Sequence, residues 1–315
     1  MTRIENVRKF LMNWVLAPSG IRIACYVLSK CIRRSSTIVQ YNRSSSRLYV
    51  LGNGPSLKKD LEKYGDEMMA YDRLAVNFMG TTKEYQIIRP TCYVLADPIF
   101  FVNPSDLPES SSEKVAALQD VFLNKTTWPM TIVSLGAKHD SPLMKELRSN
   151  PNITVLHASN SVPVPPDIKD FGGWSRNRYS PPAQNVINMA LYLGIVWRYP
   201  EIYLLGADTS FHTMVHVEQE TNRLYLEDEH FYGIEKRYMY KDPEQKIPDT
   251  MSNFFLNVGR AFAWYEKLRE FADWAGVRII NASSFSWIDA FERPAVSRCN
   301  DSVTDMSGAA CEKGV

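Results

Sequence analysis

Several features are scarce or missing in this sequence, and each absence excludes a class of protein. The five cysteines are scattered without a CxxC pair, so we expect neither a disulfide framework nor a zinc cluster, and we infer a reducing compartment. No apolar run reaches the roughly 18 residues of a membrane-spanning helix, because Arg22 and Lys30 interrupt the best candidate. Hydrophobic residues at 45% and charged residues at 23% exclude a wholly disordered or collagen-like chain. The 315 residues therefore predict a soluble globular protein of one large domain or two modest ones.

A basic segment opens the chain. Residues 1–47 contain nine lysines and arginines and one acid, so they carry +8 and the remaining residues carry −7. Apolar stretches alternate with these cations, as in an amphipathic segment at an anionic membrane surface, but a helix packed on the domain explains the pattern equally well. We expect a basic arm over residues 1–46 and a disordered tail over residues 296–315. A secretory signal peptide fits poorly because the apolar segment is broken.

Short apolar runs alternate with helical patterns between these ends. The sequence predicts strands at residues 47–51, 74–76, 92–95, 131–135, 153–156, 202–205 and 277–280, and helices at 112–123, 142–149, 183–197 and 253–275. Strands that alternate with helices predict an α/β fold with a Rossmann-like, mostly parallel sheet and helices on both faces. Residues 161–182 are expected to form a long loop over the sheet, and residues 212–250 an irregular insert.

Two turns that follow predicted strands are candidates for ligand binding, because parallel sheets bind ligands beyond the carboxyl ends of their strands. The first is the glycine turn at residues 52–56, where two glycines let backbone amides approach an anion and Pro55 and Ser56 suit a helix start, so phosphate is the expected ligand. A turn that only redirects the chain is equally common. The second places Asp208 just after Gly206, where its carboxylate can accept sugar hydroxyls or cap the next turn.

A third candidate is the acidic run before His230. Residues 227–229 are Glu-Asp-Glu, and three acids beside a histidine favour the imidazolium, which suits a general base near neutral pH. The alternative is a solvated acidic turn with a half-buried histidine that has no catalytic role. A metal site is a further alternative, because Asp228 and Glu229 with His212 or His216 have the ligand types that bind a divalent cation.

With these turns in order, the chain resembles the bacterial sialyltransferases of glycosyltransferase family 42 and related proteins of polysaccharide gene clusters. The matching segments are residues 51–57, Asn77, 93–98, 201–208, 230–233 and 279–283, which together span roughly residues 47–295. The resemblance implies one Rossmann-like catalytic domain over residues 47–295, a glycosyltransferase A-type variant with a lid insert at about 212–250. It also implies a CMP-activated sugar donor and no metal or other cofactor.

The resemblance also carries roles for individual residues. His230 falls on the position of the base that deprotonates the acceptor hydroxyl, which then attacks the anomeric carbon and expels CMP with inversion. The family's two phosphate-binding tyrosines are missing near Ser210, so His212, Tyr225 or Tyr232 is expected to replace them. The nucleotide-binding set comprises Gly52, Asn53, Gly54, Pro55, Ser56, Asn77, Asp97, Gly206, Ala207 and Asp208.

The leading interpretation is an inverting, metal-independent glycosyltransferase that transfers sialic acid, Kdo or a similar sugar to a surface glycan or lipid-linked acceptor. It would work at the cytoplasmic face of the inner membrane, bound peripherally through the arm, without a nucleic-acid partner. One alternative is a pterin-type pyrophosphokinase that uses ATP and Mg²⁺ held by Asp97, Asp208 and Asp228. Another is a non-catalytic nucleotide-sugar-binding subunit. All three require the amides around Gly54 and the carboxylate of Asp208 to face each other across a crevice that accepts a nucleotide.

Overall fold

The structure is a computed structural model that describes residues 40–107, 109–135, 142–158, 162–163, 169–176, 179–180, 185–230, 233–242 and 247–294. Most of the predicted arm and the whole predicted tail lie outside these ranges. Within the described ranges, no helix combines the length and hydropathy that a membrane crossing requires.

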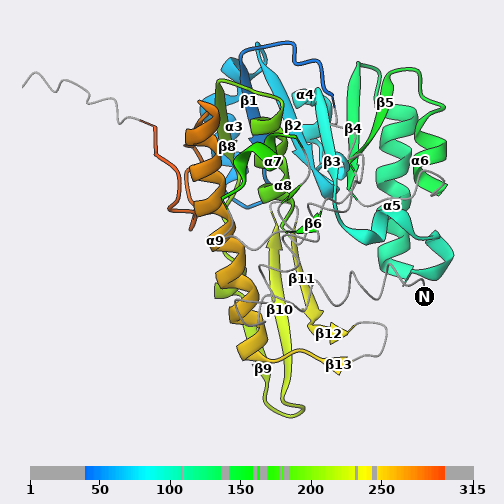
Figure 1. Cartoon of the computed structure of the whole chain (residues 1–315). Helices are drawn as coiled ribbons and strands as arrows, with labels where there is room; N and C mark the ends of the chain where they lie inside the picture. Colours follow the sequence, from blue (N-terminus) through cyan, green and yellow to red (C-terminus); the bar gives the residue numbers. More distant parts are fainter. Residues whose placement is uncertain are drawn as a thin grey trace, which may run out of the picture.

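A seven-stranded parallel sheet forms the centre of the molecule (Figure 1). The strand order is β14-β8-β1-β2-β3-β4-β5, and every neighbouring pair is parallel. The strands are β1 (Arg47–Leu51), β2 (Asp72–Val76), β3 (Cys92–Leu95), β4 (Met130–Leu135), β5 (Ile153–Ala158), β8 (Glu201–Leu205) and β14 (Arg278–Asn281). All seven predicted strands are present, which confirms the Rossmann-like α/β prediction.

Helices cover both faces of this sheet, as predicted. One face packs against α3 (Leu57–Met68), α4 (Glu84–Ile88), α5 (Glu109–Asp120) and α6 (Pro142–Leu147). The other face packs against α7 (Phe171–Ser175), α8 (Val186–Val196) and α9 (Met251–Ala275). Shorter turns are η2 (Asn77–Thr81), η3 (Pro98–Phe101), η4 (Pro104–Asp106) and η5 (Val121–Lys125).

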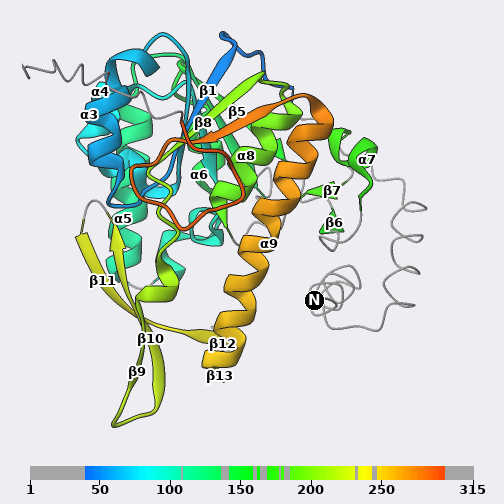
Figure 2. The same ribbon diagram turned by 90° about the vertical axis from the view of Figure 1, so that its left-hand side faces the viewer.

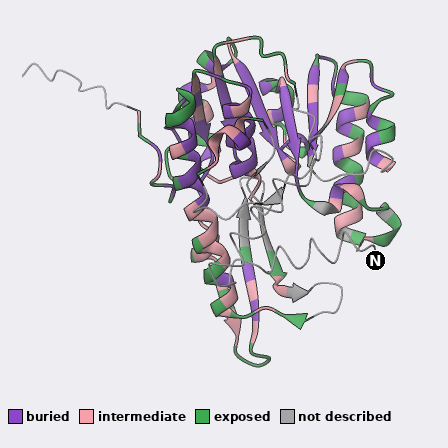
Figure 3. Ribbon diagram, viewed as in Figure 1, coloured by how far each residue is buried: buried purple, intermediate pink, exposed green. Residues whose placement is uncertain are grey.

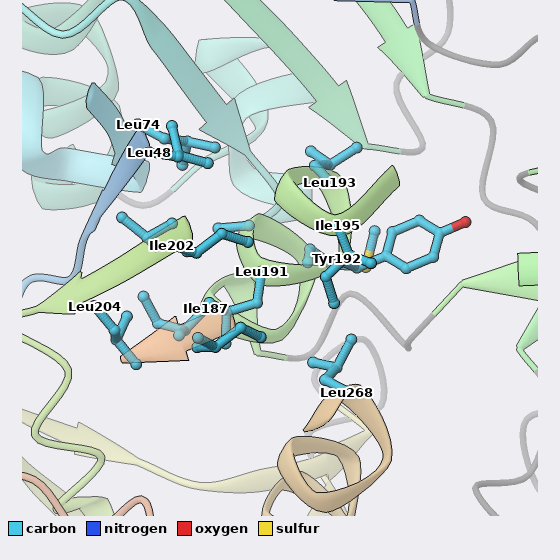
Figure 4. Packing of buried hydrophobic residues seen from close by; sticks show 14 of the residues in the cluster. Leu48, Leu74, Ile187, Leu191, Tyr192, Leu193, Ile195, Ile202, Leu204 and Leu268 are labelled. Atoms are coloured by element: carbon cyan, nitrogen blue, oxygen red, sulfur yellow. The ribbon is translucent and has the colours of Figure 1, made fainter. Parts of the chain in front are cut away.

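Side-chain alternation along the strands divides the core into two layers. Leu48 and Val50 of β1 face α8 and α9, whereas Tyr49 and Leu51 face α3. Helix α8 is apolar nearly all round, and Figure 4 shows its side chains between the sheet and Leu268 of α9. Because each buried leucine or isoleucine contributes about 1.5–3 kcal/mol, this packing fixes the strand ends that carry the candidate turns.

Where the structure describes residues 212–250, they form regular strands rather than the irregular insert that the sequence predicted. The chain forms η6 (Phe211–Thr213) and then a three-stranded antiparallel sheet of β9 (Val215–Glu218), β10 (Arg223–His230) and β11 (Gly233–Tyr238). A second small pair follows, β12 (Tyr240–Asp242) with β13 (Ile247–Pro248). Leu224 and Leu226 of β10 pack with Phe254 of α9 in a small cluster. Figure 3 shows that the insert sheet is much less buried than the central sheet.

Residues 161–182 are also more regular than predicted where the structure describes them. They contain β6 (Val162–Pro163), which pairs in parallel with β7 (Tyr179–Ser180), and the single-turn helix α7 between them. Trp174 of α7 is fully buried against α8 and α9, with its ring centroid 5.5 Å from that of Trp264. This buried aromatic ring, which the loop prediction ignored, anchors the segment.

Candidate functional site

The two predicted turns meet where the chain reverses its progress across the sheet. From β1 the chain runs outward through β2 to β5, and it then returns to add β8 and β14 on the other side of β1. In open parallel sheets, ligands bind outside the carboxyl ends of the strands at such a switch point. The glycine turn leaves β1 and residues 206–208 leave β8, so both lie at this position.

The glycine turn is bonded directly to the chain that leaves β8. The amide of Gly52 donates to the carbonyl of Leu205 at 2.8 Å, and the amide of Gly54 donates to the carbonyl of Gly206 at 2.8 Å. A Cβ atom on Gly52 would lie 2.3 Å from the carbonyl oxygen of Gly206, so a side chain cannot fit. These glycines permit a close approach between two chain segments, and their amides are not the anion cradle that the sequence predicted.

Asp208 fills the position expected for a bound anion. Its side chain is buried, and it accepts hydrogen bonds from the amide of Ser56 at 3.2 Å and from the Ser56 hydroxyl. A Cβ atom on Gly54 would lie 2.1 Å from Asp208 Oδ1. The predicted crevice between Gly54 and Asp208 is therefore replaced by direct contact, and the N-terminus of α3 is already neutralised by this carboxylate.

Burial also changes the acidity of this carboxyl group. Removal from water raises the pKa of Asp208 above its ordinary value, the hydrogen bonds from Ser56 oppose that rise, and the neighbouring Asp60 charge adds to it. Asp208 therefore holds its proton more tightly in the folded protein than in the unfolded chain.

A second buried carboxylate, Asp60, ties three loops together and was missed in the sequence. It accepts hydrogen bonds from the amide of Gly206 at 2.8 Å, the amide of Ser284 at 2.6 Å and the hydroxyl of Ser56 at 3.4 Å. These donors come from the loops after β8, β14 and β1. The signal in the sequence was an acid on the apolar stripe of α3, where Leu57, Asp60, Tyr64 and Met68 are the buried positions.

On the β2 side of the glycine turn, two asparagines link adjacent strand ends. Asn53 donates from Nδ2 to the carbonyl of Val76 at 3.2 Å, and Asn77 accepts at Oδ1 from the amide of Ala96 at 3.4 Å. Asn77 adopts the left-handed region with φ of 46°. Asn53 Oδ1 is buried and finds no hydrogen-bond partner among the described residues. A buried acceptor of this kind marks a position where a ligand or water donor is needed.

The remaining predicted nucleotide residues have local roles in the structure. Asp97 is exposed and caps η3 by accepting from the amide of Ile99 at 3.0 Å. Ala207 donates from its amide to the Ser283 hydroxyl at 3.1 Å, and its carbonyl accepts from the Ser286 hydroxyl at 2.6 Å. Pro55 and Ser56 line the pocket described next.

A pocket of about 720 Å³ opens beside Asp208. Its lining residues come from the start of α3, the loops after β8 and β14, η6 and the insert sheet. Figure 2 shows how the backbones of α3, α9 and the insert sheet are arranged. The loop after β14, in orange-red, crosses between α3 and α9 in that view. The lining residues are Pro55, Ser56, Lys59, Asp208, Ser210, Thr213, Met214, His216, Glu227, Ser284, Phe285 and Trp287. Polar hydroxyls, two carboxylates and exposed aromatic rings therefore face one open space.

Aromatic rings form one wall of this pocket. Phe285 is 51% exposed and Trp287 is 47% exposed, and their centroids lie 6.2 Å apart. The backbone amide of Trp287 donates to the carbonyl of Asp208 at 2.9 Å, which holds the wall against the chain leaving β8. The ring of His212 lies edge-on to Trp287 at 4.6 Å, and its buried Nδ1 has no partner among the described residues. The sequence prediction for the segment stopped at residue 283 and did not include these two rings.

The insert contributes a histidine and a carboxylate to the opposite side of the pocket. His216 Nε2 lies 3.8 Å from Glu227 Oε2, and its ring stacks on Tyr225 at 5.3 Å. His230 is the last residue of β10, and its backbone pairs with that of Gly233. Its side chain is not among those that the structure describes. Tyr232 lies outside the described residues altogether.

The described residues contain no group of three or more histidine, cysteine, aspartate or glutamate side chains placed to hold a metal ion. The side chains of Asp228 and Glu229, which the metal alternatives need, lie outside that part of the chain.

Comparisons with known proteins add little to this picture. A scan against protein-family models and a search of curated proteins found no match. Among solved structures, the chain is similar to a MAf glycosyltransferase from Magnetospirillum magneticum AMB-1, with 12% identity and a TM-score of 0.43 over 81% of this chain. The chain spans 34% of the length of that protein. So distant a likeness carries no assignment of activity.

Proposed function

We propose that this protein is a glycosyltransferase that transfers a sugar from a CMP-activated donor, such as sialic acid or Kdo, to a surface glycan or lipid-linked acceptor. The observation that carries the proposal is the pocket at the carboxyl ends of β1 and β8, which combines Asp208 and Glu227 with exposed aromatic rings. Carboxylates accept hydrogen bonds from hydroxyl groups, and apolar ring surface covers the C–H faces of a sugar. The pocket therefore suits a polyhydroxylated ligand.

Charge favours the acceptor rather than the donor phosphate as the occupant of this pocket. Among its described lining residues, Lys59 is the sole lysine or arginine, whereas Asp208 and Glu227 are both acids. A phosphate placed beside two carboxylates would be repelled by several tenths of a kcal/mol or more. The crevice between Gly54 and Asp208 that the sequence interpretation required is filled by the Asp208 side chain, so the nucleotide cannot bind there. We instead place the nucleotide on the β2 side of the glycine turn, where the unpartnered Oδ1 of Asn53 and the neighbouring Asn77 supply polar groups.

The proposed reaction moves one proton and exchanges one bond. A base removes the proton from the acceptor hydroxyl, the oxygen bonds to the anomeric carbon, and the bond from that carbon to the phosphate oxygen breaks, so that CMP leaves and the configuration inverts. His230 is the proposed base. Lys59 stands at the start of α3, where a cation can stabilise the departing phosphate from the pocket edge.

The structure offers a rival for the base. His216 lies in the pocket, and a histidine held beside a carboxylate such as Glu227 has the arrangement of an oriented proton acceptor. The variants His230→Ala and His216→Ala separate the two. The variant that lacks the base should lose transfer while keeping its affinity for CMP, and a His230→Ala protein that retains most of its turnover would remove His230 from the mechanism.

Nucleotide binding distinguishes this proposal from its alternatives. A thermal-shift panel with CMP, CDP and ATP, each with and without Mg²⁺, should show stabilisation by cytidine nucleotides without metal. Stabilisation by ATP that requires Mg²⁺ would instead support the pterin-type pyrophosphokinase. Binding of CMP-sugar without turnover on any acceptor would support the non-catalytic subunit.

We also propose that the basic arm holds the protein peripherally on an anionic membrane at the site of polysaccharide synthesis. The +8 charge of residues 1–47 supports this, because each lysine or arginine near an anionic surface contributes about 1 kcal/mol. Deletion of residues 1–40 should release the protein from anionic vesicles and preserve activity on a soluble acceptor. Vesicle binding that is unchanged by the deletion would refute the role of the arm.

A further inference from the structure

The insert sheet has one face turned to the core and one turned to solvent. Leu224 and Leu226 of β10 pack inward on α9. The alternate residues of β10, Arg223 and Tyr225, point the other way because successive side chains of a strand leave opposite faces. Tyr225 pairs with Tyr238 across β10 and β11, and with His216 across β10 and β9.

The outward side chains form a continuous column, which we call the insert stack. Its members are, in spatial order, His216, Tyr225, Lys236, Tyr238, Arg223 and Tyr240. Lys236 Nζ lies 4.1 Å from the ring centroid of Tyr225 and 5.2 Å from that of Tyr238. Arg223 Cζ lies 4.4 Å from the centroid of Tyr238 and 5.3 Å from that of Tyr240. From Tyr225 to Tyr240, aromatic rings and cations therefore alternate along the column.

This arrangement holds flexible polar groups in fixed positions. A free lysine or arginine side chain loses rotamer entropy when it binds a ligand, and a stacked one has already lost part of it. Glu218 adds to the order, since it accepts from Lys236 Nζ at 3.3 Å and from the Tyr238 hydroxyl at 2.6 Å. The tyrosines are half-buried, so part of each side chain remains accessible along the sheet.

The insert stack is continuous with the pocket. His216 belongs to both, because it lines the pocket and stacks on Tyr225. Glu227, two residues beyond Tyr225 on the same strand, lines the pocket as well. A chain-like ligand whose end lies beside Asp208 would therefore leave the pocket along this face.

Charge decides what kind of chain this face accepts. Residues 212–250 carry −4 as a whole, and on the described part of this face the cations Arg223 and Lys236 are matched by the acids Glu218 and Glu227. A polyanion such as nucleic acid, or an anionic lipid surface, therefore meets no net positive charge here. We propose that the insert stack binds the saccharide chain of an acceptor glycan of low charge and leads its end into the pocket. The term acceptor rests on the proposed function, whereas binding of the saccharide does not.

The test measures binding to the full-length protein with no donor present. The probes are neutral oligosaccharides of glucose, galactose, mannose and N-acetylglucosamine, and a heparin oligosaccharide serves as the polyanionic probe. Binding is detected by saturation-transfer NMR, and its affinity is measured by titration. At least one neutral probe should bind, and Tyr238→Ala should weaken it by about 5- to 30-fold. The matched control is Tyr71→Ala, because Tyr71 is also half-buried beneath an arginine, with Arg47 Cζ at 4.8 Å from its ring, but lies outside the insert, immediately before β2 of the central sheet.

Each outcome decides the proposal. Tyr238→Phe keeps the ring, so it should retain most of the binding even if Tyr238→Ala unfolds the insert. Failure of every neutral probe, stronger binding of heparin, or equal affinity in wild type and Tyr238→Ala would overturn the role of the stack and leave it as a stabiliser of the insert. If the protein binds a saccharide through the insert stack but binds no nucleotide, the proposed function is refuted and the role of the insert stack is not.

Discussion

Replacing Gly54 with alanine tests the contact on which the site is built. The new Cβ would lie 2.1 Å from Asp208 Oδ1 and 2.8 Å from the carbonyl oxygen of Gly206. Ordinary van der Waals contact requires the Cβ and Oδ1 atoms to be more than about 1 Å farther apart than this. The Asp208 carboxylate must therefore move away from Ser56, from whose amide it accepts a hydrogen bond at 3.2 Å. The perturbation therefore breaks a buried charged hydrogen-bond pair and also overpacks the turn.

The magnitude follows from these losses. Two hydrogen bonds to a charged group contribute about 1.5–3 kcal/mol each, overpacking costs about 1–3 kcal/mol, and renewed hydration of Asp208 through the open pocket returns part of this. We expect Gly54→Ala to lower the free energy of unfolding by about 3–5 kcal/mol, measured by urea denaturation.

The same helix supplies the control. Gly65 lies inside α3 with nothing within 4 Å of an added Cβ, so Gly65→Ala should stabilise the protein by about 0.5–1 kcal/mol. A Gly54→Ala protein whose free energy of unfolding lies within about 1 kcal/mol of the wild-type value would refute the tight contact with Asp208.

Three further substitutions probe the site. Asp60→Asn leaves at least one of its three loop donors without an acceptor and should cost about 1.5–3 kcal/mol in urea denaturation, whereas the exposed Asp66→Asn on the same helix should change stability by less than about 0.5 kcal/mol. Trp287→Ala should raise the KM for a glycan acceptor by roughly 5- to 30-fold, and Trp274→Ala, exposed on α9, should leave it unchanged; equal effects would exclude the aromatic wall. Because burial raises the pKa of Asp208, stability contributed by its protonated form is fully present below the unfolded value of about 3.9 and is lost as pH rises through the folded value. Asp208→Asn should remove that part of the pH dependence, so any stability advantage of the variant at neutral pH should shrink on acidification; urea midpoints that run parallel at all pH values would contradict this.

The sheet was predictable because its signal is local. Strands buried on both faces read as unbroken apolar runs, and that pattern alone predicted the strands at residues 47–51 and 202–205. The same pattern did not predict the strands of the insert, because those strands are half-exposed. Leu224 and Leu226 alternate with Arg223 and Tyr225, and the charged positions made a regular strand resemble a loop.

The site was only partly predictable because its contacts join distant segments. The sequence pointed correctly to the turns around Gly54 and Asp208 as neighbours at the sheet edge. It did not reveal that they touch, since a glycine required by a close approach looks the same as one required by a phosphate. Asp60 and Trp287 gain their roles only from partners 146 and 79 residues away, at Gly206 and Asp208 respectively, so no local pattern could identify them.

The most direct test of the central claim is a crystal structure of the protein soaked with CMP together with a neutral oligosaccharide that binds it. The account predicts nucleotide density at the carboxyl ends of β1 and β2, beside Asn53 and Asn77, and saccharide density in the pocket beside Asp208 and Trp287. Nucleotide phosphate in the pocket between Asp208 and Glu227, or ligand density at the opposite edge of the sheet, would contradict it.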